Sequence, residues 1–205
     1  MTARSWVRQL QELGGALRMV ALDLPGHGES DPAPAASVEA HAAAVADFLS
    51  ALERGPSVVI GHSLGGSIAI ALAARRPDLV RGLVLIASCV KLPLVDSVGE
   101  RLVAYLPGPL RRLLFFSMVK KVLFAPEAPA DAVTITMQEL RACRPETILN
   151  DVRVARAMDL TEQAGGLDVP TGQRRRWAQA STASARARSA RAHRAPALRL
   201  GAALT

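Results

Sequence analysis

One serine in the sequence stands in a pattern typical of a catalytic nucleophile. The pattern is G-x-S-x-G followed by one more glycine, and its residues are Gly61, His62, Ser63, Leu64, Gly65 and Gly66. In a nucleophile elbow the serine occupies a sharp, strained strand-to-helix turn, and small neighbours let the strand and the helix approach each other. Gly61 and Gly65 meet this demand, and Gly66 adds room. The Leu64 N–H, at the helix N-terminus, would face a developing oxyanion.

The same glycines have a second interpretation, a βα turn that binds a phosphate or simply packs. No lysine follows the glycines, which argues against a P-loop, and the spacing does not fit G-x-G-x-x-G. The motif therefore predicts acyl transfer at Ser63 more strongly than phosphate binding.

The flanking residues predict the elements that position the motif. Apolar runs predict short strands at 17–22, 57–60 and 83–87, and helical periodicity predicts helices over 5–13, from an N-cap at Ser37 to Gly55, and from the motif to Pro77. Apolar strands that alternate with amphipathic helices predict an α/β fold with a parallel sheet and helices on both faces.

The second half of the chain changes character. Residues 91–166 show only helical periodicity, interrupted by prolines, which predicts a helical cap inserted into the core. Residues 167–171 look like the start of a further core strand that does not continue. Residues 172–205 are an Arg/Ala/Ser mixture without core periodicity, and we expect this tail to be disordered.

These segments together resemble the α/β-hydrolase fold family. The likeness runs over residues 4–171 and lies in the loop Val20–Ser30, in the motif with its strand and helix, and in the apolar strand after Pro77. It implies a core over residues 1–90, a cap over 91–166, and a serine hydrolase of the carboxylic-ester, thioester or small-amide kind. It implies no cofactor and no metal, and a small acyl compound as substrate.

The resemblance also implies an acid and a histidine base after the cap, in the order Ser, Asp or Glu, His. No Asp or Glu follows Asp168, and the later His193 lacks apolar and glycine surroundings. Asp96 is a weak candidate for the acid, while His27 and His62 fit structural roles better than that of a base. The triad acid and base are therefore not identified, and we expect the chain to be inactive or impaired as a hydrolase.

The front of the chain departs from the family as well. The likeness implies a central strand between the runs that end at Leu22 and Ile60, and no such strand precedes residue 4. Without it the first run has no proper neighbour in the sheet. We therefore expect a chain truncated at both ends.

The charge of +7 is concentrated in the tail. The first 171 residues hold 17 basic and 18 acidic side chains, whereas the last 34 residues hold 8 arginines and no acid. The tail has one Trp and no spaced aromatic residues, so nucleic-acid binding, if any, would be non-specific. No apolar run approaches the roughly 20 residues of a membrane span, and no signal peptide is evident. Cys89 and Cys143 fit free thiols in a cytoplasmic protein.

Two other hypotheses stay open beside the hydrolase. One is a non-catalytic binding protein that keeps the fold without the triad, and the other is nucleic-acid binding through the tail. The tail itself has a further interpretation. Acidic residues vanish where the family likeness stops, while Arg, Ala and Ser rise together, as in a GC-rich coding sequence translated out of frame from about Gly172.

Overall fold

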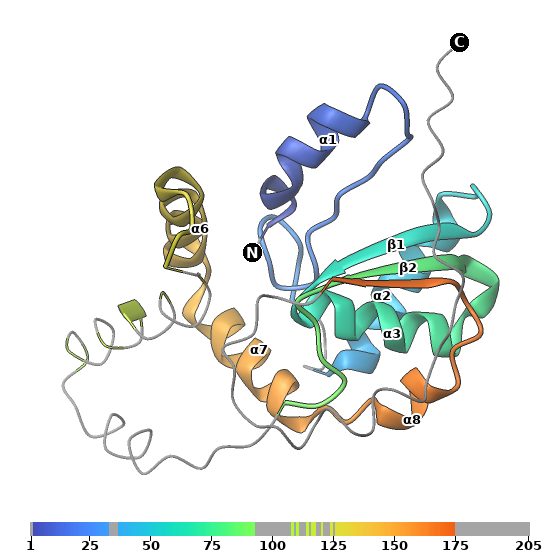
Figure 1. Ribbon diagram of the computed structural model, residues 1–205. Helices are drawn as coiled ribbons and strands as arrows, with labels where there is room; N and C mark the ends of the chain where they lie inside the picture. Colours follow the sequence, from blue (N-terminus) through green and yellow to red (C-terminus); the bar gives the residue numbers. More distant parts are fainter. Residues whose placement is uncertain are drawn as a thin grey trace.

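The computed structural model describes residues 2–32, 37–92 and 126–174, with a few separate positions between 108 and 124. Its elements, in chain order, are η1 (Ala3–Trp6), α1 (Val7–Leu13), α2 (Val38–Ala51), β1 (Ser57–His62), α3 (Leu64–Arg75), η2 (Pro77–Leu79), β2 (Val80–Ile86), α6 (Ala130–Ala142), α7 (Pro145–Ala157), α8 (Thr161–Gly165) and β3 (Thr171–Arg174), where η marks a 3-10 helix. Figure 1 shows α2 and α3 on one side of the sheet and α1 on the other.

The strands form one parallel sheet in the order β1-β2-β3. β1 and β2 pair along their whole length, ending with His62 beside Ile86, and β3 pairs with the second half of β2. Parallel strands connected through helices are the arrangement that the apolar runs predict. The predicted parallel α/β fold is confirmed for the described residues.

The core lies between this sheet and the helices α2 and α3. Leu72 of α3 is 1% exposed and Leu83 of β2 is 2% exposed. Helix α2 begins as predicted, because the Ser37 hydroxyl oxygen accepts a hydrogen bond from the Ala40 N–H at 3.1 Å. The burial of Leu72 and Leu83 in one core holds α3 against the sheet, and with it the turn that joins β1 to α3.

The opposite face of β1 is more open than expected. Val58 and Ile60 pair with Gly82 and Val84 on the face away from α3, and their exposed fractions are 47% and 38%. The expectation of helices covering both faces is therefore wrong at β1 within the described residues. Apolar residue type predicted burial, but burial needs a partner element at that face.

The predicted strand at 17–22 is also wrong. Residues 18–24 pair with no described strand, and Leu17 and Val20 are 56% and 60% exposed. A strand exists only where a neighbour takes up its backbone N–H and C=O groups. Among the described residues β1 has a single strand neighbour, β2, and the 18–24 segment is not hydrogen-bonded to its free edge.

The strand whose start was predicted at 167–171 is present, but it lies further along the chain. β3 covers Thr171–Arg174, so three residues that were expected in the disordered tail belong to the sheet. The side chains of Thr171, Gly172 and Gln173 are exposed, so β3 is held by its backbone pairing with β2, which apolar patterning does not reveal. The tail from 175 on lies outside the described residues.

The expected cap contains helices where it is described. α6, α7 and α8 fall inside residues 91–166, and Val154 of α7 is 2% exposed in the same core as Leu72. Leu160 between α7 and α8 is 1% exposed, and its N–H donates to the Val90 carbonyl at 2.8 Å. Residues 93–107 of the predicted cap lie outside the described residues.

Candidate active site around Ser63

Ser63 stands between the end of β1 and the start of α3 in an unusual backbone conformation. Its φ is 53° and its ψ is −123°. Positive φ is costly for a residue with a side chain, and this ψ lies outside the small left-handed region that such residues visit. Ser63 itself is exposed. The turn thus presents a strained serine at the carboxyl edge of the sheet, where ligands of α/β folds bind.

The backbone around Ser63 is organised for an anionic oxygen. The Ser63 carbonyl accepts the Gly66 N–H at 3.0 Å, which starts α3 directly after the serine. The first N–H groups of a helix have no acceptor within the helix, and Leu64 is the first residue of α3. The Leu64 N–H is therefore available at the positive end of a helix of twelve residues.

The glycines of the motif do not contribute equally. A Cβ added at Gly61 would lie 2.5 Å from the Gly65 carbonyl oxygen and 2.5 Å from the Gly66 backbone, so β1 and α3 touch where Gly61 meets these two residues. A Cβ at Gly65 would meet nothing within 4 Å. Gly65 therefore takes part in the close approach through its backbone, but the expectation that residue 65 must be small is wrong, because a side chain there would enter open space.

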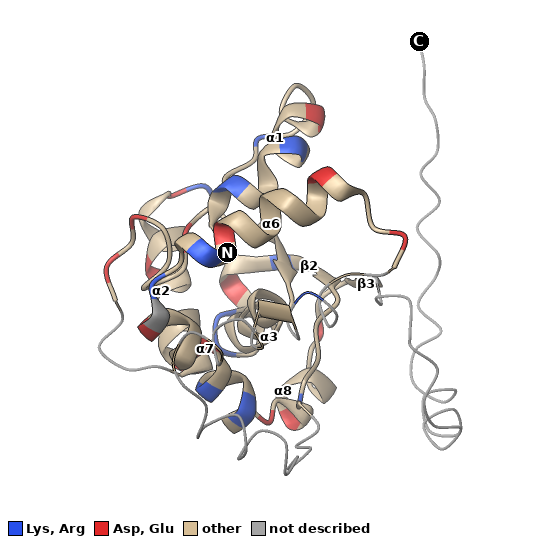
Figure 2. Ribbon diagram, turned by 90° about the vertical axis from the view of Figure 1, so that its left-hand side faces the viewer, with Lys and Arg blue, Asp and Glu red and all other residues tan. Residues whose placement is uncertain are grey.

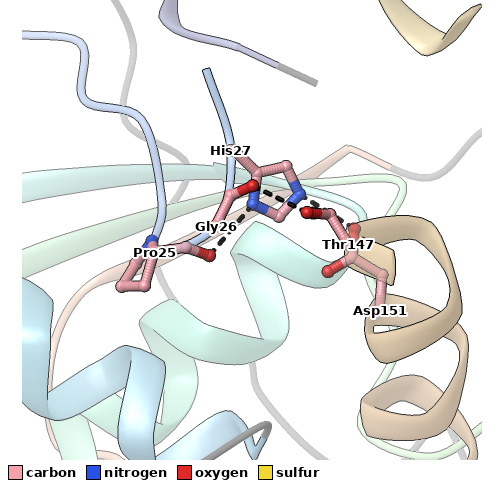
Figure 3. Close-up of polar contacts among 5 residues, drawn as sticks. All are labelled: Pro25, Gly26, His27, Thr147 and Asp151. Atoms are coloured by element: carbon pink, nitrogen blue, oxygen red, sulfur yellow. Dashed lines mark hydrogen bonds and ion pairs between the residues drawn. The ribbon is translucent and has the colours of Figure 1, made fainter. Parts of the chain in front are cut away.

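His27 is bound on both sides of its ring (Figure 3). Its Nε2 lies 2.9 Å from Oδ2 of Asp151 on α7, and its Nδ1 lies 3.3 Å from the Pro25 carbonyl oxygen. Both neighbours are acceptors, and His27 is 4% exposed. Both nitrogens are thus directed at Pro25 and Asp151 and not at the Ser63 hydroxyl, which agrees with the structural role expected for His27.

A second bond joins the same loop to α7. The Thr147 hydroxyl donates to the Gly26 carbonyl at 2.7 Å, one helical turn before Asp151 (Figure 3). Local sequence patterns could not predict these contacts, since Thr147 and Asp151 are more than a hundred residues away from the loop. A helical period places them on one face of α7, but does not say what that face touches.

The other histidines differ in their surroundings. His41 on α2 is 4% exposed, and its Nδ1 lies 2.7 Å from the Ser37 carbonyl oxygen. His62 is half-buried beside Ser63. No described residue shares a hydrogen bond with the Ser63 hydroxyl. The candidates Asp96 and His193 lie outside the described residues.

The described residues contain no cluster of side chains suited to bind a metal ion. Within 2–32, 37–92 and 126–174 no three His, Cys, Asp or Glu side chains are grouped to hold a metal ion. Cys89 and Cys143 are both free, and burial raises the pKa of the Cys89 thiol. In Figure 2 basic and acidic residues are interspersed over the helices. Among the described helices none is long and apolar enough to cross a membrane.

Comparison with known proteins places these features in a family. A family model described as alpha/beta hydrolase fold matches residues 2–124. Lipase LipV of Mycobacterium tuberculosis is 43% identical over 89 residues, which are 43% of this chain and 34% of the lipase. The pimeloyl-[acyl-carrier protein] methyl ester esterase of Neisseria meningitidis serogroup C is 32% identical over 158 residues, which are 73% of this chain and 60% of the esterase.

Solved structures agree on the fold. A structure of a thermophilic esterase has a TM-score of 0.64 at 29% identity, covering 84% of this chain and 64% of that one. An esterase from Exiguobacterium antarcticum has a TM-score of 0.72 at 18% identity, covering 84% of this chain and 68% of that one, and shows the fold alone. The chain spans 60% or less of the length of the two curated relatives described above.

Proposed function

Because the chain belongs to the α/β-hydrolase fold family, we propose that Ser63 is the nucleophile of a serine hydrolase acting on carboxylic esters, thioesters or small amides. The observation that carries the proposal is the backbone of Ser63, with φ 53° and ψ −123° at an exposed strand-to-helix turn. Such strain persists only where the surrounding structure enforces it, and it is concentrated at functional sites.

The reaction proceeds through an acyl-enzyme. Ser63 Oγ attacks the carbonyl carbon, and the Leu64 N–H donates to the oxyanion that forms. The carbon–oxygen bond to the alcohol breaks, and the alcohol leaves with a proton. Water then attacks the acyl-enzyme, which releases the carboxylic acid and restores the Ser63 hydroxyl.

We further propose that this chain turns esters over slowly. Both ring nitrogens of His27 are bound to Pro25 and Asp151, and Nδ1 of His41 is bound to the Ser37 carbonyl, so none of these three nitrogens is bound to Ser63. If no residue outside the described ranges supplies a base, water accepts the Ser63 proton. Loss of the base and the acid costs several powers of ten in rate in serine hydrolases, and the oxyanion donors and binding account for what remains.

Active-serine labelling tests the nucleophile directly. The full chain is incubated with a fluorophosphonate probe, and the modified peptide is located by mass spectrometry. Because fluorophosphonates react fast only with a base-activated serine, labelling is carried out with added imidazole, and we expect one adduct at Ser63, absent in Ser63→Ala and retained in Ser50→Ala, which changes an exposed serine on α2. Equal labelling of the wild type and Ser63→Ala would contradict the proposal.

Added imidazole tests the slow turnover. Imidazole should accelerate p-nitrophenyl acetate hydrolysis by the wild type above its effect on Ser63→Ala, because it supplies a base to a preformed nucleophile. A wild type already far faster than Ser63→Ala without imidazole would show that a base is present. An ester is chosen as the substrate because two relatives are named a lipase and a methyl ester esterase.

A further inference from the structure

The segment Ile86–Cys89, which begins with the last residue of β2, touches the Ser63 turn at three places. The first contact is at the nucleophile itself. The Ser63 N–H donates to the Ile86 carbonyl at 2.9 Å, and the Ser88 hydroxyl donates to the same carbonyl at 3.1 Å. Both lone pairs of this oxygen are thus used, one of them to hold the strained residue.

The second contact lies one turn into α3. Ser67 is 0% exposed, and its hydroxyl donates to the Cys89 carbonyl at 2.7 Å. A serine within a helix more often bonds to its own helix or to water. Here the hydroxyl reaches out of α3 and ties the start of this helix to the segment after β2.

The third contact is steric. A Cβ placed on Gly66 would clash with Ser88 Oγ and lie 2.6 Å from Ser88 Cβ. Gly66 and Ser88 are therefore packed backbone to side chain. Ala87, the residue before Ser88, has a φ of 49°, so the segment that holds Ser63 is itself in a conformation that side chains disfavour.

We propose that Ile86–Cys89 is a clamp that keeps Ser63 in its strained conformation, with Ser67 and Ser88 as positioning residues for the nucleophile. Strain at Ser63 would relax if the start of α3 could move away from β2, and the two hydroxyl bonds and the Gly66–Ser88 packing prevent that movement. Only the catalytic consequence of the clamp rests on the proposed function.

Amide hydrogen exchange at Ser63 tests the clamp without any activity. In the full chain, Ser67→Ala should accelerate exchange of the Ser63 N–H by about tenfold, because the tie to Cys89 is lost. Val45→Ala, in the core part of α2, serves as the stability control. If Val45→Ala accelerates Ser63 exchange as much at equal loss of global stability, or Ser67→Ala leaves exchange unchanged, the clamp is refuted.

Substitution of the glycines supplies an independent test. Gly66→Ala should accelerate exchange at Ser63, or prevent folding, whereas Gly65→Ala should change it little because its Cβ enters open space. Adding Ser88→Gly to Gly66→Ala removes the clashing atoms and should restore part of the protection. Equal effects of Gly65→Ala and Gly66→Ala, or no recovery in the double variant, would overturn the packing argument.

Fluorophosphonate labelling separates the clamp from the proposed function. If Ser63 is the nucleophile, Ser67→Ala should slow labelling several-fold at matched global stability. A wild type that is never labelled, but whose Ser63 exchange responds to Ser67→Ala, upholds the clamp and rejects the nucleophile. If Ser67→Ala changes neither the labelling rate nor the exchange rate of Ser63, the clamp is rejected and the assignment of Ser63 as the nucleophile is unaffected.

Discussion

Replacing Ser63 by glycine should make the protein more stable. The φ of 53° and ψ of −123° are accessible to glycine without steric cost, whereas the serine Cβ is strained there. Strain of this kind costs about 1–3 kcal/mol. Glycine gives back roughly 0.5–1 kcal/mol through the greater freedom of the unfolded chain. The expected net gain in unfolding free energy therefore lies between about 0 and 2.5 kcal/mol, with a middle value of about 1 kcal/mol.

The alanine variant separates strain from the hydroxyl. Ser63→Ala keeps the Cβ and hence the strain, and since Ser63 is exposed the hydroxyl contributes little to stability. The unfolding free energy of Ser63→Gly should therefore exceed that of Ser63→Ala by nearly the whole gain that glycine brings over the wild type. Ala43→Gly, at an exposed position inside α2, provides the opposite control, with an expected loss of about 1 kcal/mol.

Urea unfolding followed by circular dichroism measures these differences. For a chain of this size 1 kcal/mol corresponds to roughly 2–4 °C in Tm, so a thermal scan should show the same order of variants. The reasoning fails if Ser63→Gly is no more stable than Ser63→Ala, because the turn would then carry no strain for glycine to relieve.

The remaining predictions concern single contacts. Ser37→Ala should lower the unfolding free energy by about 1 kcal/mol in urea, since it removes the N-cap bond to Ala40; an unchanged midpoint would contradict this. Single alanine substitutions of His27 and Asp151 should each destabilise by about 1–3 kcal/mol and show coupling in a double-mutant cycle, whereas additive losses would mean that the pair does not interact. Hydrogen bonds from Lys91 and Thr161 lower the pKa of the Asp159 carboxyl to about 2. Any stability that Asp159 contributes is therefore present above pH ~4 and lost as the pH falls toward 2. In ¹³C NMR titrations Lys91→Met should raise this pKa, and an unmoved titration would remove Lys91 as its cause.

The part of the site that could be predicted is the part encoded in neighbouring residues. The turn at Ser63 follows from an apolar strand, small residues and a helix within twenty positions, and β1 and α3 lie where these signals indicate. The roles of the glycines could not be resolved in the same way. The motif G-x-S-x-G includes Gly65, where a Cβ would meet nothing, and leaves out Gly66, where a Cβ would clash. Only the three-dimensional path of the backbone shows this difference.

Features that depend on a distant partner could not be predicted. Leu17–Leu22 has the composition of a strand, yet the described part of the chain provides no ladder for it. Thr171–Arg174 has little strand character, yet it joins the sheet because the edge of β2 is available there. The bond between His27 and Asp151 spans 124 residues, and no local pattern connects them.

The geometry of the nucleophile is separable from the rest of a catalytic apparatus. Among the residues that the structure describes, every contact that holds Ser63 comes from between Ser57 and Cys89, which form one strand–helix–strand unit with its following turn. A base and an acid need other elements to approach this unit, and their loss would leave the strain untouched. A strained serine is therefore expected both in an active family member and in one that has lost its partners. The response to imidazole distinguishes the two, because it depends on the base and the Ser63 backbone does not.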